Sequence, residues 1–239
     1  MIQVRLPDAK KRGLAFYLAM EEYLAARKDT PECFFLWQVA PTVIIGRNQD
    51  LEAEVNLPYC REHAVDIVRR KSGGGCVYAD EGNLMVSYII PGPGAALDLL
   101  TGFVSRMAEA LRSLGLDAQP SGRNDVLVAG KKVSGNAFFK LPTCGIAHGT
   151  MLYDSDLEAI TAAITPSREK LSSKGIKSVR ERVTNISEQM RAAGLAAFPD
   201  TAAFAEYLAG HFRAGDGALL LKQSQILEIQ EIEKAYING

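Results

Sequence analysis

The sequence has 239 residues, of which 47% are hydrophobic and 23% are charged, so it is long enough to bury the core of one large domain. Its 27 basic and 28 acidic residues give a net charge of -1, which excludes an overall field that attracts nucleic acid or an anionic membrane. No apolar run reaches the roughly 20 residues of a membrane helix, and the first residues lack the apolar core of a signal peptide. We therefore expect a cytoplasmic protein in which any anion-binding site is local.

The first half of the chain alternates helical and strand-like segments. A broad apolar face predicts a helix from Leu14 to Arg27, and a short helical stretch is predicted at 58–64. Runs rich in β-branched and aromatic residues predict strands at 33–39, 42–46, 65–69, 76–79 and 83–90. The first two of these runs suit a hairpin or a strand pair. Three glycines at 73–75 predict a glycine loop between later strands.

The second half begins with the strongest helical pattern of the chain, at 95–114, which ends at Gly115 as a C-cap glycine should. Strand-like runs alternate with glycine turns at 126–130, 132–139 and 149–154. Further helices are predicted at 156–164, 200–213 and 223–236. No repeat or long linker divides the chain. We predict one α+β domain with a mixed β-sheet flanked by helices.

The glycine loop is the first segment whose residues suggest a binding site. Arg69, Arg70 and Lys71 precede Ser72 and the three glycines. Glycines let a backbone approach a ligand closely and leave N–H groups free to face phosphate oxygens. The segment matches neither a P-loop nor a dinucleotide-binding fingerprint. From the residues alone, an anion site and a flexible hairpin turn between solvated arginines are equally open.

A second group lies at 121–137, where Lys131 and Lys132 are framed by small residues. A lysine ammonium can stabilise negative charge on a phosphate under attack, but adjacent lysines between glycines are more often a solvated hairpin tip. The third group, at 148–150, suits either a turn that contacts a ligand or the start of a strand. The residues alone favour the second interpretation.

Together these segments resemble the lipoate–protein ligase family. The matching stretches, in the family's order and spacing, are RRKSGGGCVYADEGNL (69–84), SGRNDVLVAGKKVSGNA (121–137), HGTMLYDSDL (148–157) and KGIKSVRERVTNI (174–186). With the opening helix and LWQVAPTVIIGRNQ (36–49), the resemblance covers residues 14–190 and, more weakly, the rest. It implies the catalytic fold of biotin–protein ligases and class II synthetases.

The resemblance also implies a two-step reaction. ATP, with magnesium, converts lipoate to lipoyl-AMP, and a lysine of an acceptor protein then takes the lipoyl group. The implied acceptors are the lipoyl domains of 2-oxoacid dehydrogenase E2 proteins and the glycine-cleavage H protein.

The matching motifs imply roles for particular residues. Arg70 and the loop Gly75-Cys76-Val77-Tyr78 are expected to hold the nucleotide. Lys132 is expected to lie between the lipoate carboxylate and the α-phosphate and to act as the catalytic residue, in contact with both substrates. Asn83, Asp125 and His148 are expected to support the site.

Asp125 is also the candidate magnesium ligand, because Mg²⁺ prefers carboxylate oxygens. Candidates for the apolar lipoate slot are Leu18, Val43, Gly74, Val77, Gly135 and Ala137. The basic segment from Lys174 to Arg182 is the candidate for a part that closes over phosphate.

Two features depart from the fullest form of the family. Ala79 stands where many members have histidine. Many bacterial ligases continue into a small accessory domain, whereas this sequence ends at Gly239 soon after its last predicted helix. We therefore expect a single catalytic domain, residues 1–239, without the accessory domain. Some relatives supply that part as a separate subunit, and others act without it.

Two rival functions stay open. An octanoyl- or lipoyl-transferase of the same fold would act through a cysteine thioester without ATP. Such relatives carry the nucleophile where this sequence has 122–124, which contains no cysteine, so Cys76 and Cys144 are the thiols that this hypothesis leaves. The second rival is a non-catalytic lipoate-binding paralogue, against which the intact Lys132 and glycine loop argue.

Overall fold

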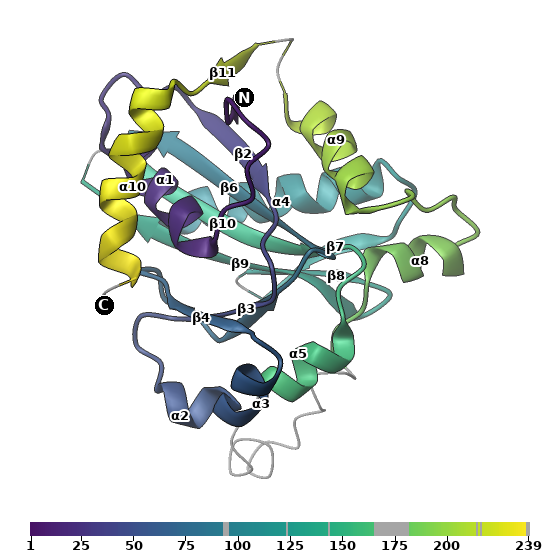
Figure 1. Cartoon of the computed structure of the whole chain (residues 1–239). Coiled ribbons are helices and arrows are strands. Elements are labelled where there is room, and N and C mark those ends of the chain that lie inside the picture. The colour runs from purple at the N-terminus through teal and green to yellow at the C-terminus, as the bar shows by residue number, and fades with distance from the viewer. Residues whose placement is uncertain are drawn as a thin grey trace.

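Figure 1 shows the computed structural model, which describes residues 1–92, 96–122, 124–142, 144–164, 182–213, 215 and 217–237. The strands of its main sheet are β1 (Ile2–Arg5), β2 (Cys33–Trp37), β6 (Asn83–Pro91), β7 (Ala118–Ser121), β8 (Asp125–Val128), β9 (Lys131–Lys140), β10 (Cys144–Leu152) and β11 (Ala218–Leu220). Within the described ranges this sheet has eight strands in the order β11-β1-β2-β6-β10-β9-β8-β7. β1 runs parallel to both of its neighbours and the other pairs are antiparallel, so the sheet is mixed as predicted.

A smaller sheet packs beside the main one. Its described strands are β3 (Thr42–Ile45), β4 (Asp66–Arg69) and β5 (Val77–Ala79), in the order β4-β3-β5. The glycine loop joins β4 to β5, which lie on opposite sides of β3 and are not neighbours. The loop is therefore a crossing between strands, and the hairpin-turn interpretation is wrong.

The predicted pairing of the segments at 33–39 and 42–46 is also wrong. β2 pairs with β6 in the main sheet, whereas β3 pairs with β4 and β5 in the small one. All four residues of β3 are buried, so this strand needs a strand on each edge and packing on both faces. A local hairpin could not supply that burial.

Helices cover both faces of the main sheet (Figure 1). They are α1 (Leu14–Ala26), α4 (Ala96–Arg112), α8 (Ile186–Ala192), α9 (Thr201–Phe212) and α10 (Gln223–Ile237). Among the described residues, three further helices lie by the small sheet: α2 (Leu51–Glu54), α3 (Leu57–Glu62) and α5 (Leu157–Ala163). The helices predicted at 14–27, 58–64, 95–114, 156–164, 200–213 and 223–236 are confirmed with small shifts at their ends.

The alternation of β6 shows how the sheet is buried on both sides. Leu84, Val86 and Tyr88 pack in a core cluster with α4, α8 and α9. Met85 and Ile89 face the opposite way, into a cluster with α1 and α10. Since successive side chains of a strand point to opposite faces, helices on both faces keep this strand dry. The predicted α+β class, with a mixed sheet flanked by helices, is confirmed.

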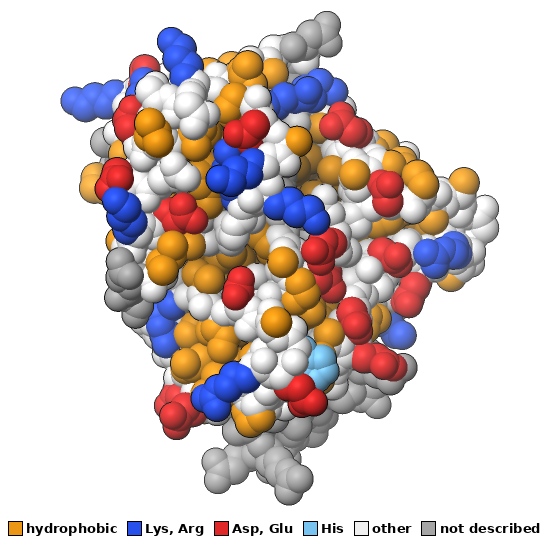
Figure 2. Space-filling view, viewed as in Figure 1, with side chains coloured by type: hydrophobic (Ala, Val, Ile, Leu, Met, Phe, Trp, Pro, Cys, Tyr) orange, Lys and Arg blue, Asp and Glu red, His pale blue; other side chains and the backbone are white. Residues whose placement is uncertain are grey.

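The charged side chains on the surface reflect the nearly equal numbers of basic and acidic residues in the sequence. Basic and acidic side chains are interspersed over the face shown in Figure 2. Among the helices of the described ranges, none has the length and apolar character that crossing a membrane requires.

The packing of α4 leads to a test of the core. Leu111 is fully buried between this helix and the sheet. We expect Leu111→Ala to lower the free energy of unfolding by about 3 kcal/mol, because it removes apolar contacts and leaves a cavity. Urea unfolding measures this change, with the exposed Glu109→Ala on the same helix as the control. A loss for Leu111→Ala no larger than that of the control would contradict the packing described.

Candidate functional site

Two adjoining cavities lie where the two sheets meet. The small cavity has a volume of about 110 Å³ and the large cavity about 650 Å³. Both are lined by Gly75, Cys76 and Val77 of the small sheet's loop and strand, and by Lys132, Gly135 and Thr150 of the main sheet. The shared lining places the junction between the cavities at these residues.

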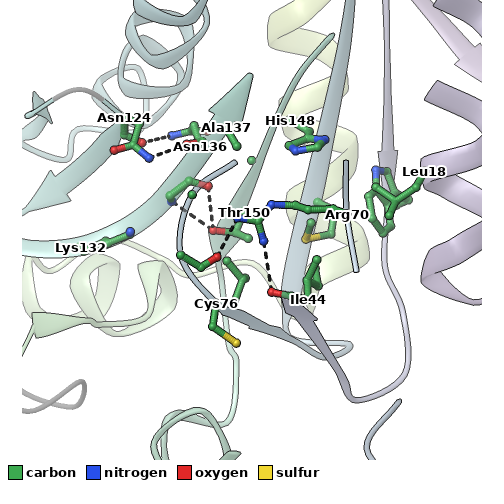
Figure 3. Close-up of a pocket in the computed structure, with 17 residues that line it drawn as sticks. Leu18, Ile44, Arg70, Cys76, Asn124, Lys132, Asn136, Ala137, His148 and Thr150 are labelled. Carbon is green, nitrogen blue, oxygen red and sulfur yellow. Dashed lines mark hydrogen bonds between the residues drawn. The ribbon is translucent and has the colours of Figure 1, made fainter. Parts of the chain in front are cut away.

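The small cavity has mainly apolar walls. Figure 3 shows the side chains that line it. The apolar ones come from α1, β2, β3, β5, β6 and β9, namely Leu18, Trp37, Ile44, Val77, Met85 and Ala137. Its polar groups include Arg70, Lys132 and His148. An apolar slot with a few fixed polar groups suits a ligand that has an alkyl part and a charged end.

Lys132 enters the site from β9. Its Nζ lies 2.7 Å from Oδ1 of Asp125, and both side chains are about one-third exposed. In Figure 3 it lies on the opposite side of the site from Leu18. A Cβ atom on Gly135 would come within 2.6 Å of the Lys132 Nζ, so the glycine leaves the space that the lysine side chain occupies. The ammonium group is thus held at the junction of the cavities.

Arg70 holds the glycine loop from within. Its guanidinium donates to the carbonyl oxygens of Gly73 at 2.8 Å and Gly75 at 2.7 Å, and to that of Ile44 at 3.2 Å. Its Nε donates to Ser72 Oγ at 3.0 Å. The side chain is buried, and this burial lowers the pKa of Arg70 from its usual value. Arg70 therefore shapes the loop; contact with a nucleotide stays a prediction.

The loop itself needs its glycines. Gly74 has φ +98°, in the region that favours glycine, and a Cβ there would lie 2.9 Å from an Arg70 nitrogen. The Gly74 carbonyl oxygen would lie 2.2 Å from a Cβ on Gly46, so that neighbouring residue also has to be glycine. The backbones at Gly46 and Gly74 therefore approach more closely than side chains at these positions would allow.

His148 joins the loop to α1. One ring nitrogen lies 2.8 Å from Ser72 Oγ, and the other lies 3.0 Å from a carboxylate oxygen of Glu21. Glu21 also accepts a hydrogen bond from Ser87 Oγ at 2.5 Å, and Ser87 in turn accepts one from Trp37 Nε1 at 2.9 Å. All of these side chains are buried. The chain of contacts links a wall of the small cavity to the glycine loop.

Sequence reasoning missed Glu21, although one signal could have found it. α1 buries nearly every side chain, and Glu21 is a charged residue within that apolar helix, 3% exposed. Buried carboxylates are rare unless they are paired. Trp37, Met85 and Asn136 line the small cavity and were also missed as site residues.

A pair of asparagines fixes the strand opposite the loop. Asn124 Nδ2 donates to the carbonyl of Asn136 at 2.6 Å, and Asn136 Nδ2 donates to the carbonyl of Asn124 at 2.9 Å. Thr150 Oγ1 accepts from the Gly135 N–H at 3.1 Å. These contacts hold the segment that carries Gly135 against its neighbouring strand.

The structure brings most of the predicted site residues together. Those that line the small cavity are Leu18, Arg70, Gly74, Gly75, Cys76, Val77, Lys132, Gly135, Ala137 and His148. Tyr78 and Asp125 line the large cavity. His148 lies in the middle of β10, which starts earlier than predicted, at Cys144.

Two predicted residues lie outside both linings. Val43 was wrong as a lipoate-slot candidate, because it faces a separate core cluster while its neighbour Ile44 lines the cavity. Asn83 is fully buried and donates to the Tyr78 carbonyl at 3.4 Å and to Met85 Sδ at 3.7 Å, so it supports the walls from behind. Of the predicted moving segment, 174–181 lies outside the described residues, and Arg182 lines the large cavity.

The cysteines near the site are poorly suited to act as nucleophiles. Burial raises the pKa of Cys76 to about 12, so its thiol stays protonated near neutral pH. Cys144 is buried in the cluster under α1, and its Sγ donates to the Ala25 carbonyl at 3.3 Å. It does not line either cavity.

The Glu21 contacts lead to a stability test. We expect Glu21→Leu to lower the free energy of unfolding by about 3 kcal/mol, because the buried Ser87 hydroxyl and His148 ring nitrogen lose their acceptor. Asp29→Leu is the matched control, because its ion pair with Arg27 is on the surface and should contribute little. Equal effects of the two variants in urea unfolding would show that the buried contacts do not stabilise the fold.

Comparison with proteins of known sequence finds relatives that are named lipoate–protein ligases. Over 172 residues the chain is 44% identical to "Lipoate--protein ligase 1" of Staphylococcus aureus strain Mu50, a match that covers 72% of this chain and 52% of that protein. The chain spans about half the length of the curated relatives it matches.

Solved structures show the same fold. One is from a study of an archaeal bi-partite lipoate protein ligase and its E2 lipoyl domain from Thermoplasma acidophilum, with a TM-score of 0.81, 25% identity, and coverage of 98% of this chain and 93% of that one. Another is described as lipoate-protein ligase A bound with ATP, with a TM-score of 0.79, 22% identity, and coverage of 98% and 95%. The sequence model of the lipoyl protein ligase A/B catalytic domain matches residues 14–213. The chain therefore belongs to the lipoyl protein ligase A/B catalytic domain family.

Proposed function

We propose that this chain uses ATP to convert lipoate to lipoyl-AMP and transfers the lipoyl group to a lysine of an acceptor protein. The observation that carries the proposal is the position of Lys132 at the junction of an apolar cavity and a larger one. The family match and the ligase names of the relatives support it.

The two cavities suit the two substrates. The small cavity, lined by Leu18, Trp37 and Met85, would take the alkyl chain and ring of lipoate, with the carboxylate at the junction. The large cavity would take the nucleotide, with its phosphates toward the glycine loop. The apolar side chains Leu127, Ile160 and Val183 in its lining could pack on a base. The structural relative described as bound with ATP is consistent with this role.

The first chemical step would take place beside Lys132. A carboxylate oxygen of lipoate forms a bond to the α-phosphorus of ATP, the bond from that phosphorus to the next bridging oxygen breaks, and pyrophosphate leaves with the electron pair. Two anions must approach each other, and the ammonium of Lys132 offsets their repulsion in a partly buried site. Its pairing with Asp125 holds the ammonium in place before the substrates arrive.

The second step needs an acceptor amine. The lysine nitrogen of the acceptor adds to the carbonyl carbon of the mixed anhydride, the bond to the AMP oxygen breaks, and AMP leaves as the nitrogen loses a proton. We propose lipoyl domains of 2-oxoacid dehydrogenase E2 proteins or the glycine-cleavage H protein as acceptors, in the cytoplasm. We also propose that residues 1–239 form the catalytic domain, and that a separate accessory subunit is the candidate for any further part.

Magnesium fits this site as an ion that accompanies the nucleotide. Among the described residues, no group of three or more His, Cys, Asp or Glu side chains could hold a metal. Mg²⁺ usually keeps several waters and binds one or two carboxylates together with substrate phosphates. Asp125, in the lining of the large cavity, is the candidate protein ligand. When bound, the ion would neutralise charge on the phosphates.

Lys132 is tested by lipoate-dependent ATP–pyrophosphate exchange, with no acceptor present. We expect Lys132→Ala to reduce the exchange rate by about 100-fold or more, because the variant lacks the cation at the site of charge development. Lys131→Ala is the matched control, since that neighbouring side chain is exposed and lines neither cavity. Exchange that survives in Lys132→Ala, or fails equally in both variants, would contradict the role of Lys132.

A thiol variant tests the rival thioester mechanism. We expect Cys76→Ser to keep lipoate-dependent exchange within about fivefold of the native rate, a difference of less than about 1 kcal/mol. The reason is that the Cys76 thiol is protonated, and that serine keeps the backbone N–H group expected to face the nucleotide. Transfer of an acyl group without ATP, abolished by Cys76→Ser, would favour the cysteine-dependent transferase instead.

A further inference from the structure

The C-terminal helix α10 reaches the glycine loop from outside. This helix, shown in yellow in Figure 1, follows residue 213, where the family match ends. Ile226 and Ile229 anchor it in the core cluster that α1 forms with the sheet. Its last turn carries Tyr236, which is partly buried against the same cluster. The end of α10 is thus held close to α1 and to the start of the loop.

Three side chains from distant parts of the chain meet at this point. Lys71 Nζ lies 2.7 Å from Glu22 Oε2, and the Tyr236 hydroxyl donates to the other oxygen of the same carboxylate. The Lys71 Nζ also lies 4.9 Å from the centre of the Tyr236 ring. We call Glu22, Lys71 and Tyr236 the outer triad. Each member contacts both of the others.

The outer triad has contacts that an ordinary surface ion pair lacks, although its Lys71 side chain is 47% exposed. Exposed pairs contribute little, because two long side chains lose freedom and water screens the charges. Here the Glu22 side chain is 21% exposed, and Tyr236 supplies a hydrogen bond and a ring face in addition. Burial, followed by the hydrogen bond to Glu22, raises the pKa of Tyr236, so its hydroxyl stays a donor at neutral pH.

Successive residues of the loop are held from opposite sides. Arg70 and Ser72 point inward, where Ser72 contacts His148 and through it Glu21. Lys71 points outward to Glu22, the next residue of α1. Adjacent carboxylates of one helix therefore hold adjacent residues of the loop, one from inside and one from outside.

We propose that Tyr236 is a positioning residue for the glycine loop, acting through Glu22 and Lys71. This inference rests on the proposed function, in which the loop faces the phosphates of ATP. Lys71 follows Arg70 directly, and the backbone at Gly75 lines both cavities. An outer triad that fixes Lys71 lowers the entropy that the loop would lose when it orders around phosphates.

The test compares Tyr236→Phe with the native chain in two measurements. Titration calorimetry with ATP and magnesium, in the absence of lipoate, should show a dissociation constant about 3- to 10-fold higher in the variant, as expected for loss of one hydrogen bond to a carboxylate. Amide hydrogen exchange of residues 71–76 without nucleotide should be faster, because the loop opens more often.

Two further variants make the test specific. Tyr207→Phe is the matched control: its hydroxyl donates to the Ala110 carbonyl, away from both cavities, so it should leave both measurements unchanged. Lys71→Met should raise the dissociation constant for ATP as Tyr236→Phe does. The double variant should bind ATP no more weakly than the weaker-binding single variant, because both substitutions act through the same contact.

The outcomes separate this inference from the proposed function. If the native chain does not bind ATP, the proposed function fails, and the hydrogen-exchange comparison still decides whether Tyr236 orders the loop. If ATP binds and Tyr236→Phe has native affinity and native exchange at 71–76, Tyr236 does not position the loop. Equal weakening in Tyr207→Phe would show a general loss of stability and would also overturn the inference.

Discussion

The shape of the site depends on one buried cation. Arg70 donates to the backbone of the glycine loop and to the strand beside it, and a guanidinium can do this because it presents several N–H donors in a rigid fork. A buried charge is costly unless its donors are satisfied, so a loop of another shape would leave Arg70 unpaired. Gly75, whose carbonyl Arg70 holds, lines both cavities. The contact that stabilises the loop thus also sets the position at which the cavities join.

The two sheets contribute different parts of the site. The small sheet supplies Arg70, the loop and Val77, whereas the main sheet supplies Lys132 and His148. The contacts of His148 with Ser72 and Glu21 cross from one part to the other. A catalytic lysine has to be held within a fraction of an ångström of its working position, and elements fixed on both sides of the site achieve this better than a loop alone. The proposed reaction depends on these contacts between the two parts of the site.

Local patterns predicted the helices, because the backbone hydrogen bonds and the apolar face of a helix lie within one segment of sequence. The helical periodicities of α1, α4 and α10 lie within single segments and were sufficient to place these helices. β1 and β11 were missed because each is short and the two pair across more than 200 residues of chain. The β2–β3 hairpin was wrong for the same reason, since β3 is buried by partners that follow it later in the sequence. Motifs located Lys132 and the glycine loop, but Glu21 acts through His148, 127 residues away, and no motif contains both.

The proposed reaction requires that the site hold the lipoate carboxylate against the α-phosphate of ATP. The most direct measurement follows oxygen-18 from the carboxylate of labelled lipoate through one round of reaction with ATP, magnesium and an acceptor lipoyl domain. Attack on the α-phosphorus predicts one labelled oxygen in the AMP that is released, because the acceptor amine breaks the bond between the carbonyl carbon and that oxygen. Label in inorganic phosphate, or lipoylation of the acceptor without labelled AMP, would contradict this mechanism.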